Sequence, residues 1–195
     1  MTQEIKITAE PRDEKTCRFI VDRPIFPGHS FYFSSKEHAS GSPMAEKLFE
    51  LDGVESLLVQ DNQVTVTANT EGNWMPLAKQ VGAAIRSVLQ AGVPLISESV
   101  LSSLPPAQEI RTRVQELFEQ QINPAIAGHG GWVELIDVRD NEVFIRMGGG
   151  CQGCGMASLT LRQGIEKTIR KLVPEVGAIM DATDHASGRN PYYQR

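Results

Sequence analysis

Two cysteines, Cys151 and Cys154, lie three positions apart in the glycine-rich stretch MGGGCQGCG, which spans residues 147–155. Thiolates at this spacing can bind one metal centre from a single turn of the chain. Cubane iron–sulfur clusters and cysteine-only zinc sites take four thiolates. The sequence has only one further cysteine, Cys17, far from the pair. The remaining ligands of such a centre would therefore have to come from outside this stretch.

Three hypotheses fit the cysteine pair: a metal or iron–sulfur site completed by a second chain, a dithiol–disulfide redox centre, or a structural turn whose cysteines merely pack. The pair is expected to join a strand to a helix, and free N–H groups at a helix N-terminus favour the thiolate of Cys154. Redox motifs of the thioredoxin type also lie between a strand and a helix. Here a hairpin, not a parallel βαβ unit, is predicted to lead into the pair, which favours the metal hypothesis.

The glycines around the cysteines suit a metal site. They permit positive φ angles and close approach of the backbone, and their N–H groups can hydrogen-bond to sulfur. One chain offers two thiolates, and a two-fold dimer that brings two such segments together offers four. This count fits a 4Fe–4S cluster that bridges a homodimer through Cys151 and Cys154, with a zinc-bridged dimer as a weaker alternative. A cluster at such an interface is released when the subunits separate, which is typical of a carrier.

The periodicity of the sequence predicts an α+β protein with two small α/β-sandwich-like domains, each a helix-flanked hairpin sheet. The first half is expected to contain strands at 4–11, 17–26 and 30–35, a helix at 42–53, a hairpin at 54–69 and a helix at 74–91. The second half is expected to contain a helix from about residue 107 to 122, strands at 132–138 and 142–147, a helix at 157–173 and a short strand within 176–183. SESVLSSLPPAQ, between them, is typical of a flexible linker. We therefore predict domains over 1–97 and 108–195, with the linker at 98–107.

The two halves contain similar hairpin sequences. VESLLVQDNQVTV (54–66) and VELIDVRDNEVFI (133–145) align without gaps, and each has a predicted helix before and after it. Either two hairpins of similar shape use similar residues, or the chain contains two related units. In the first half, NTEGNWM takes the place of the cysteine stretch and offers no metal ligand. If the repeat is real, only the second copy carries the chemistry.

The composition excludes several classes of protein. The net charge is −5, with 41% hydrophobic and 22% charged residues. The sequence contains no long basic run, so we do not expect nucleic acid or an anionic membrane as a partner. No apolar stretch approaches a membrane span, and the N-terminal residues do not resemble a secretory signal. The sequence therefore predicts a cytoplasmic protein. It shows no paired carboxylates, Ser–His–Asp set or phosphate loop, so we do not expect an enzyme.

Other residues with possible chemistry have plainer interpretations. Cys17 is expected to be a small buried residue of a strand, and His129 a polar turn residue, with a place near the cluster as the alternative. Trp74 and Trp132 are expected to be core or half-buried anchors rather than stacking platforms. Met147 and Met156 bracket the cysteine stretch, where we expect them to shield a cluster rather than ligate it.

Residues 127–176, from AGHGGWVELIDV to KLVPEV, resemble the NifU C-terminal domain, the core of Nfu-type iron–sulfur carriers. The resemblance is carried by the run GGGCQGCGMASLTL and by the tail TDHASGRNPYY. GSPMAEKLFELDGVESLLVQDNQVTVT, followed by Trp74, resembles the Nfu N-terminal domain. The two resemblances cover nearly the whole chain.

The resemblance implies a function and assigns the ligands. Nfu-type proteins receive an iron–sulfur cluster from an assembly scaffold and deliver it to apo iron–sulfur enzymes. The ligand cysteines of the family fall on Cys151 and Cys154, while its N-terminal domain lacks ligands and helps to recognise partners. The chain lacks the cysteine-bearing scaffold domain of nitrogen-fixation NifU, which argues against primary cluster assembly. It also differs from the enterobacterial Nfu type, whose N-terminal half resembles a degenerate A-type carrier.

Overall fold

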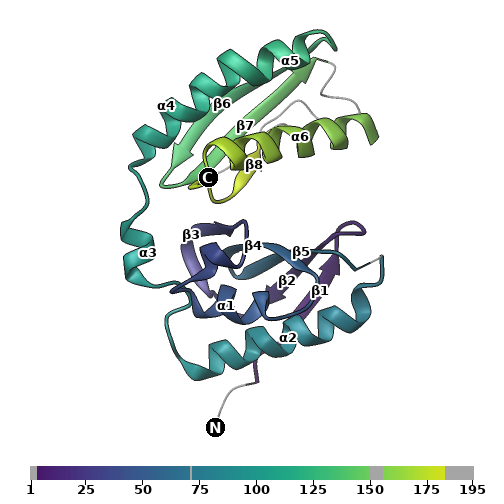
Figure 1. Cartoon of the computed structure of the whole chain (residues 1–195), viewed down its shortest axis with the longest axis vertical. Helices are drawn as coiled ribbons and strands as arrows, with labels where there is room; N and C mark the ends of the chain where they lie inside the picture. The colour runs from purple at the N-terminus through teal and green to yellow at the C-terminus, as the bar shows by residue number, and fades with distance from the viewer. Residues whose placement is uncertain (1–3, 71, 150–155, 183–195) are drawn as a thin grey trace. The chain divides into compact units, whose positions relative to one another are not determined.

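The computed structural model describes residues 4–70, 72–149 and 156–182 of the 195-residue chain (Figure 1). Its internal contacts divide the chain into two compact units, Met1–Leu104 and Pro105–Arg195. Both units combine helices with a sheet, so the predicted α+β class is confirmed.

The first unit is built on a five-stranded antiparallel sheet with the strand order β1-β2-β5-β4-β3. Its strands are β1(Ile7–Pro11), β2(Thr16–Val21), β3(Phe26–Phe33), β4(Val54–Asp61) and β5(Gln63–Ala68), and its helices are η1(Glu37–Ala39), α1(Pro43–Phe49), α2(Trp74–Ala91) and α3(Glu98–Ser102). Alternate residues of β2 and β5 are buried, because successive strand residues point to opposite faces. Figure 1 shows α1 and α2 along one face of this sheet.

The helix predicted at 74–91 is confirmed at both ends. The Asn73 side chain accepts a hydrogen bond of 3.2 Å from the Met75 N–H, and Gly92 ends the helix at a φ of 65°. Leu77, Val81 and Ile85 lie at helical spacing and are buried against the sheet. This amphipathic face, more than intrinsic propensity, holds the helix in place.

The residues predicted as a linker contain a short helix. α3 lies within 98–107, its Ser97 side chain accepts a hydrogen bond from the Val100 N–H, and Val100 and Leu101 pack against the first core. The boundary between the two compact units falls after Leu104. A helix of five residues is too short to show a helical periodicity in the sequence.

The second unit has the three-stranded sheet β6-β7-β8. Its elements are α4(Ala107–Leu117), the π-helical segment η2(Phe118–Ile122), α5(Asn123–Ala127), β6(Gly131–Arg139), β7(Glu142–Gly149), α6(Met156–Leu172) and β8(Ile179–Asp181). β6 and β7 form an antiparallel hairpin, and β8 pairs with β7 in parallel. Figure 1 shows α4 and α5 running along β6.

The helices of the second unit contribute buried apolar residues to a core on one face of its sheet. One core cluster contains Ile110 and Phe118 from the first helical segments, Ile165 and Ile169 from α6, and Ile145 from β7. We call the opposite face of this sheet the outer face. The outer face carries the alternate strand residues, namely Trp132, Glu134, Phe144, Arg146 and Gly148.

The two hairpins are alike in detail. Asp61 and Asp140 both have a positive φ at the matching turn position. The amides that follow them also match: Asn62 Nδ2 donates to the Val21 carbonyl at 3.2 Å, and Asn141 Nδ2 donates to the Glu175 carbonyl at 3.1 Å. Asn62 therefore ties its turn to the end of β2, and Asn141 ties its turn to the chain before β8. The sheets differ beyond the hairpin, because β2 is antiparallel to β5 whereas β8 is parallel to β7.

The first helical region of the second unit is longer than predicted and contains a wide turn. It continues through NPAIA as α5, although the sequence suggested an end near residue 122. Pro124 lacks an N–H, and its ring conflicts with the carbonyl four residues earlier. A π-helical turn over Phe118–Ile122 accommodates this conflict.

The wide turn places Asn123 against the free edge of β6. Asn123 Nδ2 donates to the Val133 carbonyl at 2.9 Å, and Asn123 Oδ1 accepts from the Val133 N–H at 2.8 Å. Val133 is 3% exposed, so its edge-facing backbone groups would otherwise lack partners. One side-chain amide therefore substitutes for a neighbouring strand at this position.

Replacing Asn123 with Ala is expected to lower the free energy of unfolding by about 2 kcal/mol, because two buried backbone groups lose their partners. Chemical denaturation of the full chain measures this change. Gln121→Ala, at an exposed neighbouring position, serves as the control and should change stability by less than about 0.5 kcal/mol. Equal effects of the two variants would contradict the edge-capping role.

Candidate functional site

The predicted ligands fall between two well-defined elements. β7 ends at Gly149 and α6 begins at Met156. Cys151 and Cys154 lie outside the described residues, so their assignment as ligands stays a prediction. The described residues form the frame around them: the ends of β6 and β7, Gly130 before β6, and the first turn of α6.

Gly148 lies under the ring of Trp132. The two residues are directly opposite each other in the β6–β7 ladder. A Cβ atom at position 148 would lie 2.0 Å from Trp132 Cζ2 and 2.2 Å from Cε2. The indole therefore occupies the space of the missing side chain, an arrangement in which a cross-strand aromatic residue covers a glycine.

Gly149 makes an even closer contact with the backbone. Its φ is +64°, and a Cβ atom there would lie 1.9 Å from the Gly130 carbonyl oxygen. Both the left-handed conformation and the contact require glycine. The expected use of glycine for positive φ and close approach is thus confirmed at this position. Hydrogen bonds from glycine N–H groups to sulfur stay a prediction.

Met147 anchors the end of β7 from the other side. It is 2% exposed and belongs to the core cluster beneath the helices. The structure gives Met147 a packing role in the core, and its expected shielding of a cluster stays a prediction. The side chain of Met156 lies outside the described residues.

Trp132 is a half-exposed anchor, as predicted, with 40% of its surface accessible. The guanidinium carbon of Arg146 lies 5.9 Å from the centroid of its ring. Arg146 is in turn held by an ion pair of 2.6 Å with Glu134. The indole thus lies against Gly148 with the Arg146 guanidinium over its ring. Trp74, in contrast, is a core residue of the first unit, with 6% exposure.

The elements on either side of the cysteine segment, β7 and α6, belong to a parallel βαβ unit that ends with β8. The hairpin β6–β7 leads into it as predicted, but β7, α6 and β8 form a parallel crossover. The expected hairpin is thus confirmed, but the contrast drawn from the sequence between a hairpin and a parallel βαβ unit was wrong. It failed because a strand of three residues gives little sign of its pairing direction. Topology consequently does not argue against the dithiol hypothesis.

Cys17 cannot serve as an additional ligand. It is fully buried in β2 of the first unit, as predicted. Burial raises the pKa of its thiol to about 11, so Cys17 remains protonated at neutral pH. A metal ligand must be a thiolate.

His129 is a turn residue at the cysteine end of the second unit. Its side chain is exposed, and its N–H donates to the Ile126 carbonyl at 3.0 Å. It directly precedes Gly130, which contacts Gly149. The expected turn role is confirmed, and a role at a cluster stays a prediction.

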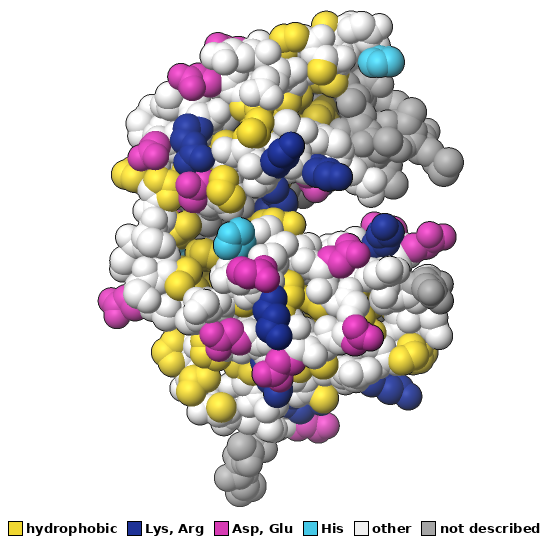
Figure 2. Space-filling view, viewed as in Figure 1, with side chains coloured by type: hydrophobic (Ala, Val, Ile, Leu, Met, Phe, Trp, Pro, Cys, Tyr) yellow, Lys and Arg dark blue, Asp and Glu magenta, His cyan; other side chains and the backbone are white. Residues whose placement is uncertain are grey.

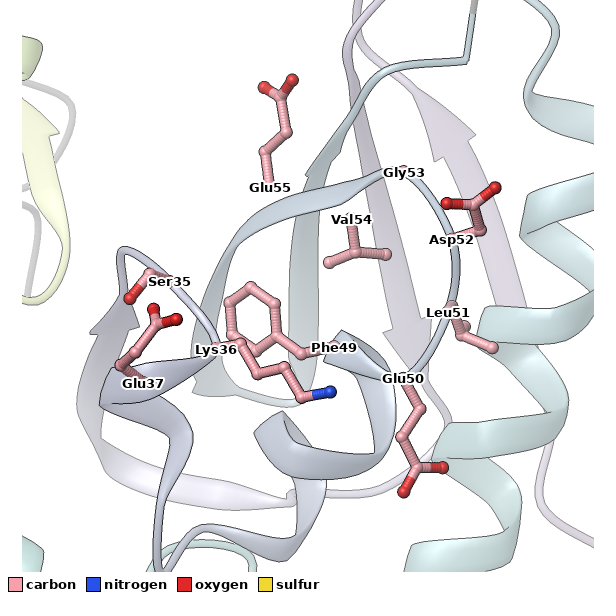
Figure 3. Close-up of a pocket in the computed structure, with 10 residues that line it drawn as sticks. All are labelled: Ser35, Lys36, Glu37, Phe49, Glu50, Leu51, Asp52, Gly53, Val54 and Glu55. Atoms are coloured by element: carbon pink, nitrogen blue, oxygen red, sulfur yellow. The ribbon is translucent and has the colours of Figure 1, made fainter.

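The first unit contains a hollow of about 470 Å³ near the end of α1. Figure 3 shows the ring of Phe49 between carboxylates on its rim, and Figure 2 shows that acidic side chains are frequent on the visible face of this unit. Hydrogen bonds from Ser35 and Lys47 lower the pKa of Glu37 and Glu50, respectively. The hollow is lined by Ser35, Lys36, Glu37, Phe49, Glu50, Leu51, Asp52, Gly53, Val54 and Glu55.

The carboxylates around this hollow are not arranged as a metal site. In the part of the chain that the structure describes, no group of three or more His, Cys, Asp or Glu side chains is placed to hold a metal ion. None of the helices in the described ranges is both long and apolar enough to cross a membrane.

Comparison with known proteins identifies the class to which this fold and frame belong. A family model described as "NifU-like domain" matches residues 114–180, and one described as "Scaffold protein Nfu/NifU N terminal" matches residues 5–92. The chain is 34% identical over 186 residues to the "Fe/S biogenesis protein NfuA" of Xanthomonas euvesicatoria pv. vesicatoria, covering 91% of this chain and 92% of that protein. These matches place the chain in the class of Nfu and NifU-like proteins. The chain belongs to the Nfu family.

Other relatives match part of the chain. The protein of the same name from Pseudomonas aeruginosa is 42% identical over 104 residues, 53% of this chain, and the match spans about half (50%) of that relative. The solution structure of a NifU-like protein from Saccharomyces cerevisiae matches with a TM-score of 0.45 and 20% identity, covering 50% of this chain and 91% of that chain.

The contacts at Gly149 predict that the stability of the protein is sensitive to substitution at this position. Gly149→Ala is expected to lower the free energy of unfolding by about 3 kcal/mol, because the positive φ and the backbone contact both oppose a Cβ atom. Gly164→Ala is the matched control: nothing lies within 4 Å of a Cβ atom at this helical position, and the variant should be more stable by about 1 kcal/mol. Denaturant titration compares the two, and a neutral Gly149→Ala would contradict the close contact.

Proposed function

We propose that the chain is a carrier that binds a 4Fe–4S cluster between two subunits and transfers it to apo-proteins. Cys151 and Cys154 of each subunit supply the thiolates. The observation that carries the proposal is the match of the NifU-like domain to residues 114–180, which include both cysteines and the glycine frame. The frame supports it because close contacts at Gly148 and Gly149 restrict the end of β7, two residues before the first cysteine.

The ligand count supports a homodimer. Cys17 is buried and protonated in the first unit, so one chain offers only the two thiolates of the Cys151–Cys154 pair. A cubane cluster takes four thiolates, which two copies of this pair provide. The described residues add no alternative group of protein ligands.

Transfer is a ligand exchange in which the cluster is cargo. An acceptor thiolate forms a bond to iron as the bond from Cys151 or Cys154 breaks, and the released cysteine leaves as a thiolate. The second subunit releases the cluster in the same way. Iron and sulfide keep their oxidation states, so no external oxidant or reductant is required. Each exchange proceeds without acid–base catalysis by the protein.

An assembly scaffold serves as the donor, and apo iron–sulfur enzymes serve as acceptors. The N-terminal unit, matched as an Nfu N-terminal domain over residues 5–92, contributes to partner recognition. The exchange takes place in the cytoplasm, where a reducing environment keeps the cysteine pair available as thiols. The two-domain organisation, with cluster binding confined to the C-terminal domain, belongs to the same proposal.

The parallel arrangement of β7, α6 and β8 favours a second candidate, a thiol oxidoreductase that uses the same two cysteines. This candidate requires a reversible disulfide between Cys151 and Cys154 and no iron. It shares the residues of the carrier but predicts a monomer. Cluster content therefore separates the two functions.

Cys151→Ser and Cys154→Ser are each expected to reduce bound iron and sulfide to near zero after anaerobic reconstitution, because a serine hydroxyl is a poor substitute for thiolate on iron. Circular dichroism should show that both variants remain folded. Cys17→Ala is the control, and it should bind as much iron and sulfide as the unmodified chain. A Cys151→Ser variant that retains a full cluster would overturn the ligand assignment.

A further inference from the structure

We infer that Trp132 is a positioning residue that fixes the end of β7, from which the chain continues to Cys151, an inference that rests on the proposed function. The indole lies on the outer face of the second unit, against the backbone of Gly148. Cys151 follows Gly148 by three residues, a length of chain that spans no more than about 11 Å. No other aromatic side chain of the described outer face lies at this end of β7.

The exposure of Trp132 distinguishes it from a core residue. It is 40% exposed, whereas Trp74 is 6% exposed. A tryptophan at a site that leaves so much of its ring in water contributes less burial energy than one in a core. Because Trp132 lies beside the end of β7, we assign its ring to holding that end of the strand and not to filling the core.

Contacts hold both the strand beside the indole and the ring itself. Asn123 binds both backbone groups of Val133, the next residue of β6. Arg146 lies over the ring and is fixed by Glu134. The π-helical turn that places Asn123 is thus connected, through β6, to the position of the indole.

The held ring constrains the end of β7. The indole blocks one side of Gly148, and the Gly130 carbonyl blocks Gly149 at the next residue. Met147 is fixed in the core on the opposite face. The chain therefore leaves β7 with little freedom to rotate, and the removal of the indole opens one side of this exit.

The test compares Trp132→Ala, Trp132→Phe and Phe144→Leu in the full chain. Phe144 is the matched control because it is an aromatic residue of the same outer face with an arginine over its ring, Arg139 at 4.9 Å. The first readout is the rate at which iodoacetamide alkylates Cys151 and Cys154 in the cluster-free protein, resolved by mass spectrometry. The second is the rate at which a ferrous chelator bleaches the reconstituted cluster.

Trp132→Ala is expected to raise both rates by at least about threefold, because the end of β7, from which the chain continues to Cys151, becomes less constrained. Trp132→Phe should restore both rates to within about twofold of the unmodified chain, since a ring again covers Gly148. Phe144→Leu should leave both rates unchanged even if it lowers the unfolding temperature. This pattern separates positioning from a general loss of stability.

Unchanged rates in Trp132→Ala would overturn the inference, as would rates in Phe144→Leu that rise as much as those in Trp132→Ala. The alkylation readout does not need a cluster. If the unmodified chain binds no cluster but alkylation still responds to position 132, the carrier function fails and the positioning role stands. If the cluster forms and neither rate responds, the positioning role fails alone.

Discussion

The second unit depends on a close contact between two chain segments at the end of its hairpin. The Gly130 carbonyl occupies the space that any side chain at position 149 would need, and the Trp132 indole does the same at position 148. Because a Cβ atom at either place would overlap atoms of β6 or of the residue before it, the contact explains consecutive glycines without reference to sulfur. It also fixes the point at which the chain departs toward Cys151. Glycine usually gives the backbone conformational freedom. Here two glycines instead allow close packing that restricts the backbone at the end of β7.

Supporting contacts extend from this point through the unit. Met147 fixes β7 in the core, Asn123 completes the edge of β6, and Asn141 ties the far turn to the chain before β8. A carrier needs both parts of this arrangement. Its ligands must be few enough per subunit for the cargo to leave, while the frame must be rigid enough for two subunits to present four thiolates together. In the proposed carrier, two cysteine ligands per subunit meet the first requirement, and the braced end of β7 contributes to the second.

Much of this architecture could be predicted from the sequence because its signals are local. The alternation of VTVTA and the apolar stripe of the helix at 74–91 each report a face that packs against a core. The π-helical turn, the Asn123 amide and the parallel pairing of β8 could not be predicted, since each depends on residues that meet only in the folded chain. The sequence identified the glycines as permissive but not the indole that makes Gly148 necessary. The Cys151–Cys154 pair was found by its spacing and by family resemblance, and its ligand role remains a prediction.

The central claim is that two subunits share one 4Fe–4S cluster through four cysteines. Anaerobic native mass spectrometry of the full chain, after reconstitution with iron and sulfide, tests it most directly. The carrier account predicts a dimer whose mass exceeds that of two chains by one 4Fe–4S unit. A monomer without iron, lighter by two hydrogens after mild oxidation, would contradict it and favour the dithiol function.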